Sequence, residues 1–334
     1  MSNISGSQTN VQYAFEDSDA YDQAIGSHSA SDEDFVAFGQ GVTSDVSESK
    51  GAERVYGQGS RNAQSSPELN YEGSITINGV LNNVYWLLGV LGANADAGSG
   101  PSSWTHTYTE ADSLPSATIR RPHKFTVNQY EQFIGCRMDS ATINLAVNSN
   151  VLFTIENKFR KSSVVDGVLS FSLDTQAPFT FTGGTLEFPS GTQIAKVQSC
   201  ELNVVNTLQK VPEAGTKFAA DYVATKREHN INNLAIAITD FTLFKKIMYN
   251  TDGTDSAMDD IDTGTFPSLV LNFTNADGHT IVATLANFKV NERTLPGNPE
   301  EITTLTTSGW CESLTSVVYT NATEDAPTEA TNVS

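Results

Sequence analysis

The stretch SITINGVLNNVYWLLGVLG, residues 74–92, changes its hydrophobic period partway along. Ile75 and Ile77 alternate with polar neighbours, which predicts a strand. Beyond them, apolar residues recur at helical spacing, at Leu81, Val84, Leu87, Leu88 and Leu91. Asn82 or Asn83 can cap the start of that helix. The sequence therefore predicts a strand that runs directly into a short amphipathic helix.

The same pattern occurs a second time, in LAIAITDFTLFKKIMYN, residues 234–250. Alternating Leu234, Ile236 and Ile238 predict the strand, and Asp240 is a suitable helix cap. The apolar face of the second helix consists of Phe241, Phe244, Ile247 and Met248. A repeat of domain size sets the architecture, because each copy supplies one structural unit.

The composition favours a mainly β chain with an acidic surface. Its 334 residues suffice for two domains, and Gly, Thr, Ser and Asn are frequent while long helical patterns are absent. The net charge is −20, from 39 acids and 19 bases. Such a surface repels nucleic acid, because nucleic-acid binding uses Lys and Arg to neutralise phosphates. It also suits solubility in very high salt, and composition does not separate the two explanations.

The cysteines and the hydropathy pattern indicate a cytosolic site of synthesis. Cys136, Cys200 and Cys311 lie far apart without a CxxC pair, which favours buried, reduced thiols. The N-terminus lacks the basic and apolar regions of a signal peptide. Apolar runs fall short of the roughly 18 residues that span a bilayer, so we expect no membrane insertion.

Two segments of similar size lie between polar ends. Residues 1–33 contain no Lys or Arg and are expected to form a flexible acidic arm, and residues 323–334 a flexible tail. Residues 34–165 and 166–322 each follow the order strand, long polar loop, strand, helix and three further strands. The long loops are residues 57–70 and 207–230. If the duplication holds, the chain contains two tandem β domains, each flanked by one short helix.

The sequence predicts no catalytic site and no cofactor. The five histidines lack metal-ligand spacing and are expected at surfaces or turns, and the Walker, G-x-S-x-G and G-x-G-x-x-G motifs are absent. The one candidate metal site is an acidic loop containing Asp252, Asp255, Asp259, Asp260 and Asp262. Carboxylates at this density can hold calcium, but they do not fit the EF-hand frame, and the sequence favours a solvated acidic loop over a calcium site.

Several spaced motifs resemble the tail tube proteins of long-tailed double-stranded DNA viruses. In the first segment they are RVYGQGSRNAQSSPELNYEGSITINGVLNNVYWLLGVLG (54–92), WTHTYTEADSLPSATI (104–119) and FIGCRMDSATINLAV (133–147). In the second segment they are PFTF (178–181), VQSCELNVVN (197–206) and LAIAITDFTLFKKIM (234–248). The resemblance extends over residues 35–320.

The resemblance implies a structural virion protein without enzymatic activity. Members of this family fold as a β-sandwich or partly open barrel with one flanking helix, and they form rings that stack into a tube for DNA ejection. Six domains surround the axis, so a chain with two domains implies a homotrimeric, pseudo-hexameric ring. If the repeat is false, the ring is a plain homohexamer. A β-sandwich binding module, cell-surface or secreted, is the competing interpretation.

The resemblance also implies partners and a location. Its expected partners are further copies of the chain, a tape measure protein in the lumen, and terminator and baseplate or tip proteins at the ends. Double-stranded DNA is expected to pass through without stable binding. The location is the virion tail, with synthesis and assembly in the host cytoplasm.

Alternation within strands predicts which residues line the lumen. We expect strands 139–159 and 268–290 to form the barrel, with Ile143 and Leu145 packed under the helix. The lumen-facing candidates are Thr142, Asn144 and Asn148. The long loops are expected at the rim, where the candidates for contact with the next ring are Ser60, Arg61, Asn62, Lys217 and Phe218.

Overall fold

The chain is mainly β, as the sequence predicts, and its strands pair antiparallel. The computed structural model describes residues 11–16, 35–51, 54–56, 63–65, 70–98, 104–124, 128–167, 176–188, 191, 193–194, 197–237, 245, 268–294 and 304–321. The strands before residue 167 are β1 (Gln12–Phe15), β2 (Val36–Ala37), β3 (Gln40–Gly51), β4 (Arg54–Tyr56), β5 (Ala63–Ser65), β6 (Asn70–Val80), β7 (Gly92–Gly98), β8 (Trp104–Glu110), β9 (Ala117–Lys124), β10 (Asn128–Ala146), β11 (Leu152–Phe159) and β12 (Lys161–Asp166). The strands after it are β13 (Phe179–Glu187), β14 (Gln193–Ile194), β15 (Val197–Val205), β16 (Leu208–Pro212), β17 (Ala219–Ala224), β18 (Glu228–Ala237), β19 (Leu269–Asn275), β20 (Thr280–Ala286), β21 (Lys289–Thr294), β22 (Thr304–Cys311) and β23 (Ser313–Asn321).

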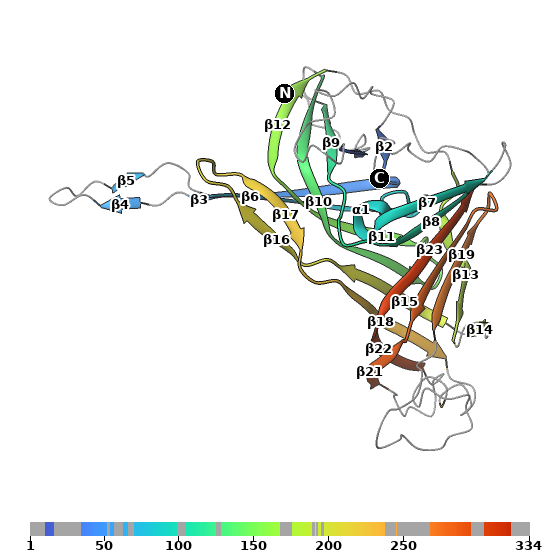
Figure 1. Ribbon diagram of the computed structural model, residues 1–334. Helices are drawn as coiled ribbons and strands as arrows, with labels where there is room; N and C mark the ends of the chain where they lie inside the picture. Colours follow the sequence, from blue (N-terminus) through green and yellow to red (C-terminus); the bar gives the residue numbers. More distant parts are fainter. Residues whose placement is uncertain are drawn as a thin grey trace.

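One large sheet takes strands from both halves of the chain. Its main run has the order β3-β6-β11-β10-β15-β18-β22-β21, with the first four strands from the first half and the last four from the second. The N-terminal part of β10 leaves this run and pairs with β9 and β12, and β9 pairs in turn with β1. Figure 1 shows β10 bending from this upper group into the large sheet.

A second sheet covers one face of the large sheet. Its order is β14-β13-β19-β20-β23-β8-β7, so it too combines both halves. Ile143 and Leu202 of the large sheet meet Phe273 and Val317 of the second sheet in the apolar layer between them. Because both sheets bury one face against the other, alternate residues on each strand become core.

The two predicted segments share this core. β10 of segment 34–165 pairs with β15 of segment 166–322, and β8 pairs with β23. A single hydrophobic cluster contains buried residues of both segments. The described parts of the two segments therefore pack as one body, and the division into two tube domains stays a prediction.

The helix predicted after β6 is shorter than its periodicity suggests. α1 comprises Leu87–Leu91 only, all of its residues are buried, and Trp86 at its N-cap makes no side-chain cap bond. Asn82 and Asn83 lie in the buried connection before it. Gly92, with φ of 99°, ends the helix in the left-handed conformation that glycine adopts without strain. The second predicted helix lies outside the described residues, apart from Lys245, which is helical.

Part of the predicted N-terminal arm is a buried strand. β1 lies between β2 and β9, and the side chains of Val11 and Tyr13 are inside the core. Glu16 accepts hydrogen bonds from the hydroxyls of Ser116 (2.7 Å) and Thr118 (2.9 Å). The prediction of a flexible arm over residues 1–33 is therefore wrong for residues 11–16. The four residues of β1 form an ordered strand because they pair with β9.

The long strands predicted beside the helices also differ in detail. Residues 139–159 form the end of β10 and all of β11, with a turn between them in which Asn148 has φ of 59°. Residues 268–290 include the hairpin β19–β20, which belongs to the second sheet and not to the large one. Alternation predicts that a strand is half-buried, but it does not say in which sheet it lies.

Candidate functional site

The large sheet presents a polar face on the side away from the core. On β10, Ile143 and Leu145 are buried, whereas Thr142 is half-buried and Asn144 is exposed. Strand pairing places Thr142 beside Thr154 of β11 and Asn203 of β15 on this same face. Two of the three lumen candidates therefore lie side by side on an open sheet surface, while Asn148 lies in the turn beyond β10.

The open polar face is rich in short hydroxyl and amide side chains and in carboxylates. By register, on the first half it carries Thr43, Asp45, Ser47, Ser49, Glu72, Ser74, Thr76, Asn78, Thr142, Asn144, Thr154 and Glu156, and on β15 it continues with Glu201 and Asn203. Two bases lie on this face in the described part of these strands. Lys158 forms an ion pair with Asp139 at 3.3 Å, and Arg137, opposite Lys158, forms one with Asp221 at 3.2 Å. The face is therefore anionic as well as hydrophilic, and offers phosphates few partners.

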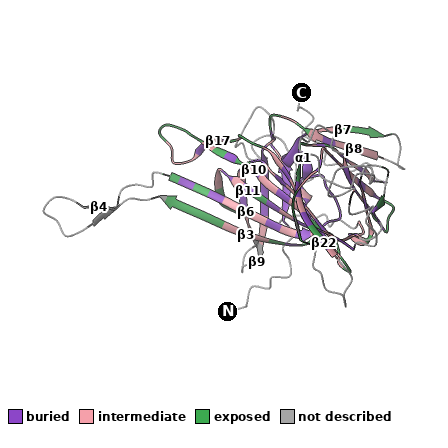
Figure 2. Cartoon of the chain, turned by 90° about the horizontal axis from the view of Figure 1, so that it is seen from below, coloured by how far each residue is buried: buried purple, intermediate pink, exposed green. Residues whose placement is uncertain are grey.

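The large sheet has two free ends. Among the described strands, β3 pairs only with β6 and β21 only with β22. Figure 2 shows β3 at the margin of the molecule with exposed residues along it. Long unpaired strand edges are templates for pairing with another chain, so these margins are candidate assembly surfaces.

Two hairpins lie at one rim of the large sheet. β4 and β5 form the hairpin between β3 and β6, and β16 and β17 form the hairpin between β15 and β18. Lys217 and Phe218, at the tip of β16–β17, contact the first half of the same chain: the carbonyl of Lys217 accepts from Tyr71 N at 3.1 Å. The rings of Phe218 and Tyr71 lie 5.4 Å apart. Ser60, Arg61 and Asn62 lie outside the described residues.

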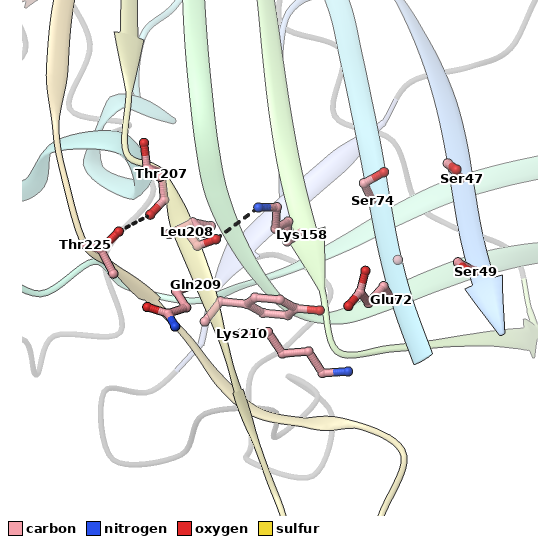
Figure 3. Close-up of a pocket in the computed structure, with 12 residues that line it drawn as sticks. Ser47, Ser49, Glu72, Ser74, Lys158, Thr207, Leu208, Gln209, Lys210 and Thr225 are labelled. Carbon is pink, nitrogen blue, oxygen red and sulfur yellow. Dashed lines mark hydrogen bonds between the residues drawn. The ribbon is translucent and has the colours of Figure 1, made fainter. Parts of the chain in front are cut away.

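A polar groove of about 620 Å³ lies where β16–β17 meets the rim, and Figure 3 shows its lining. It is lined by Ser47, Ser49, Glu72, Gly73, Ser74, Lys158, Thr207, Leu208, Gln209, Lys210, Tyr222 and Thr225. Lys158 Nζ donates to the carbonyl of Leu208 at 3.1 Å, and Lys210 Nζ donates to Asn70 and to the carbonyl of Tyr71. Both ammonium groups thus join the hairpin to the sheet, and the groove is a structural seam.

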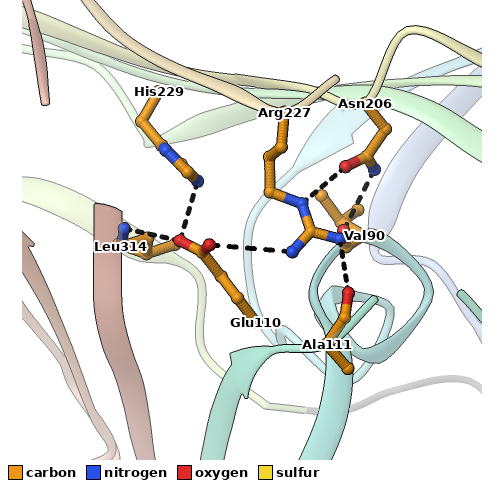
Figure 4. Close-up of polar contacts among 7 residues, drawn as sticks. All are labelled: Val90, Glu110, Ala111, Asn206, Arg227, His229 and Leu314. Carbon is orange, nitrogen blue, oxygen red and sulfur yellow. Dashed lines mark hydrogen bonds and ion pairs between the residues drawn. The ribbon is translucent and has the colours of Figure 1, made fainter. Parts of the chain in front are cut away.

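A second polar cluster ties α1 and β8 to the second half, as Figure 4 shows. Asn206 Nδ2 donates to the carbonyl of Val90 at the end of α1 (3.0 Å), and Arg227 Nε donates to Asn206 Oδ1 (2.8 Å). Arg227 Nη2 donates to the carbonyl of Ala111 at 3.1 Å. The last turn of α1 leaves carbonyls without helical partners, and this cluster satisfies one of them.

Glu110 connects this cluster to β23. Its Oε1 accepts from the backbone N of Leu314 at 2.7 Å and lies 3.0 Å from His229 Nε2, while its Oε2 lies 3.8 Å from Arg227 Nη1. Burial opposes the charged form of Glu110, but the hydrogen bonds from His229 and Leu314 outweigh it, so the pKa of Glu110 lies below its ordinary value. Burial also lowers the pKa of Arg227.

Replacing Glu110 by Gln is expected to destabilise the fold at neutral pH. The lowered pKa means that the carboxylate contributes stability above pH 4.5, and that this contribution is lost as the pH falls through the folded value. We expect a loss of about 1–3 kcal/mol near pH 7 and a smaller difference near pH 3, measured by urea unfolding. Equal losses at the two pH values would contradict this role of the charge.

The other groups that the sequence singles out include three cysteines and several buried histidines. Cys136, Cys200 and Cys311 are free and buried, as predicted, and burial raises the pKa of Cys200 and Cys311 to about 12. The prediction of surface or turn histidines is wrong for His106 on β8 and His229 on β18, which are buried beside the carboxylates of Asp96 and Glu110. His279 is also buried, but it lies in the β19–β20 connection, so the turn prediction holds for it.

Within the described residues, no group of three His, Cys, Asp or Glu side chains could hold a metal ion. The acidic loop from Asp252 to Asp262 lies outside those residues. Among the described residues, no helix is long and apolar enough to cross a bilayer.

Comparison with known proteins gives one result that covers most of the chain. A family model described as phage tail tube protein matches residues 6–309. No match was found among curated proteins. The matched range includes both rim hairpins, the polar face described above and every strand of the two sheets before β22.

Proposed function

Because the chain belongs to the phage tail tube protein family, we propose that it forms rings that stack into a tube through which double-stranded DNA is ejected. The observation that carries this proposal is the large sheet with its polar face and two unpaired ends. An edge-to-edge array of such sheets buries the free edges and encloses a lumen. No catalytic role and no cofactor are part of the proposal.

Three chains are proposed for each ring. The large sheet takes four strands from each half, and in each half the first two strands of the run enclose a rim hairpin: β3 and β6 in the first half, β15 and β18 in the second. Two equivalent segments per chain would give a pseudo-hexameric ring from three copies. A homohexamer is the alternative, if only one segment of each chain contributes to the inner wall.

The polar face is proposed to line the lumen. Thr142 and Asn144 would face the passing DNA, and the carboxylates of Asp45, Glu156 and Glu201 would repel its phosphates. Such a wall wets easily and gives the DNA few points of attachment. Acidity on the outside of the tube can serve solubility, including in high salt, as a separate effect.

The proposed surroundings follow from the tube. A tape measure protein would occupy the lumen before ejection, and terminator and baseplate or tip proteins would meet the two ends. The chain would be made and assembled in the host cytoplasm and reside in the virion tail.

Electron microscopy of the purified protein tests the proposal. We expect rings or tubes about 10 nm wide, the span of six small domains. Native mass spectrometry of single rings should give three chains of 35.9 kDa each. Six chains per ring would contradict the trimer and leave the tube intact, whereas a monomer at all concentrations would contradict the tube.

A further inference from the structure

The β16–β17 hairpin is docked on the first half of its own chain. Arg137 of β10 forms an ion pair with Asp221 at 3.2 Å, and Arg160, after β11, forms one with Glu213 at 3.0 Å. The hairpin thus leaves the second half and lies against the strands of the half beside it. In this way it clasps two neighbouring segments of the large sheet.

The β4–β5 hairpin is its counterpart in the first half. Tyr56 pairs with Ala63 at its tip, as Pro212 pairs with Ala219 in β16–β17. The segments of sequence between the paired strands have the same length, residues 57–62 and 213–218. Their sequences are GQGSRN and EAGTKF, so a glycine, a hydroxyl residue and a base recur at the same three positions. The two hairpins are therefore equivalent elements of the repeat.

Their surroundings differ. Figure 1 shows β4 beyond the ends of β3 and β6, away from both sheets, whereas β17 lies close to β10. On the β3 side of the first half, the described chain offers no further segment for a hairpin to clasp. In a closed ring, that side faces the second half of the next copy.

We propose that β4–β5 clasps the second half of the neighbouring copy in the same ring, as β16–β17 clasps the first half of its own chain. This inference rests on the proposed ring. It assigns the rim hairpin of the first half to lateral contact within a ring, where the sequence alone predicts contact with the next ring. The partner is a second copy of this chain.

Strand register identifies the receiving surface. We align the two halves by matching the buried Gly73 of β6 with the buried Ile231 of β18. In this alignment Arg137, which lies opposite Lys158, corresponds to Glu292, which lies opposite Ser308. Arg160 follows Phe159, which pairs with Gly73, and Trp310 follows Gly309, which pairs with Ile231. Glu292 and Trp310 therefore occupy the positions from which the two arginines hold β16–β17.

The chemistry of this surface fits an interface. Trp310 is 36% exposed, and Lys289 Nζ lies 5.1 Å from its ring centroid. Exposed tryptophans are characteristic anchors of protein contacts. Arg137 and Arg160 of the first half form ion pairs with acids of β16–β17. At the aligned position the second half has the acid Glu292, which suits a basic partner, and the sequence of residues 54–65 contains Arg54 and Arg61.

A photo-crosslinking residue at Gln64 tests the proposal in assembled rings made from a mixture of isotopically labelled and unlabelled chains. Gln64 corresponds by register to Asp221, which serves as the matched control site. We expect Gln64 to crosslink between chains, to residues 289–294 or 308–312. The control at Asp221 should crosslink within its own chain, near Arg137.

The outcomes separate this inference from the proposed function. Rings in which Gln64 crosslinks to a different surface, such as the opposite rim of another ring, would overturn the lateral clasp and leave the tube intact. A protein that never forms rings would overturn both.

A substitution adds an independent measurement. Trp310→Ala should raise the concentration needed for ring assembly on the order of tenfold without changing the unfolding temperature of the isolated chain. Val164→Ala, at a 64% exposed site on β12, should change neither quantity. Unchanged assembly of the Trp310 variant would contradict the receiving surface.

Discussion

Replacing Trp86 by Ala is expected to lower the free energy of unfolding by about 3–5 kcal/mol. The Trp86 side chain is fully buried at the N-terminus of α1, where its ring centroid lies 5.6 Å from that of Phe153. It also packs with Leu87 and Ile143 between the two sheets. Truncation would leave a large cavity at the point where the helix and both sheets meet. Urea unfolding of the isolated chain measures the loss.

Trp310→Ala is the matched control, because it removes the same side chain from an exposed site. We expect it to change the free energy of unfolding by less than about 1 kcal/mol. Equal losses for the two tryptophans would contradict the assignment of Trp86 to the shared core. Equal losses would also indicate that Trp310 stabilises the isolated chain, and this result would count against the proposed role of Trp310 in the contact between copies.

Local periodicity predicts the elements around residues 74–92 well, but not their limits. Ile75 and Ile77 are buried on β6, and Leu87 to Leu91 are helical, as their spacing indicates. Leu81 and Val84 share the helical spacing but lie in a buried connection. In such a connection every apolar side chain is buried, so burial alone produces a pattern that resembles a helix.

Long-range pairing could not be predicted from the sequence. β8 pairs with β23 although more than 200 residues separate them, and β1 completes a sheet whose other strands start beyond residue 35. Short alternating strands fit any sheet edge equally well, and the choice of partner depends on the whole fold. For this reason the sequence predicts two segments without predicting that they share a core.

The faces of β10 were predictable because one side of the strand must pack against apolar neighbours. Ile143 and Leu145 are buried and Asn144 is exposed, as alternation requires. The docking of Lys217 and Phe218 on Tyr71 was not predictable, since polar loops carry no periodic signal. The position of Lys217 and Phe218 depends on contacts with Tyr71 of β6, which is distant in the sequence.

Replacing both Thr142 and Asn144 by Lys is expected to leave ring assembly intact and to slow DNA ejection on the order of tenfold. Both side chains lie on the open polar face, where longer polar side chains do not disturb the core. In the proposed tube, every ring would then present new ammonium groups to the passing phosphates. Attraction of this kind weakens steeply as salt rises, so ejection should recover between about 50 and 200 mM salt. Release of DNA from variant virions measures the rate.

Two controls assign the effect to the location of the charge. Thr142→Ser with Asn144→Gln keeps the face neutral and should eject normally. Thr315→Lys adds a base at an exposed position of β23 in the second sheet, which lies on the outside of the proposed tube, and should also eject normally. Slow ejection with Thr315→Lys and normal ejection with the double Lys variant would reverse the assignment of faces. Because all three variants keep Ile143 and Leu145 in the core, a difference among them would report on the lumen and not on folding.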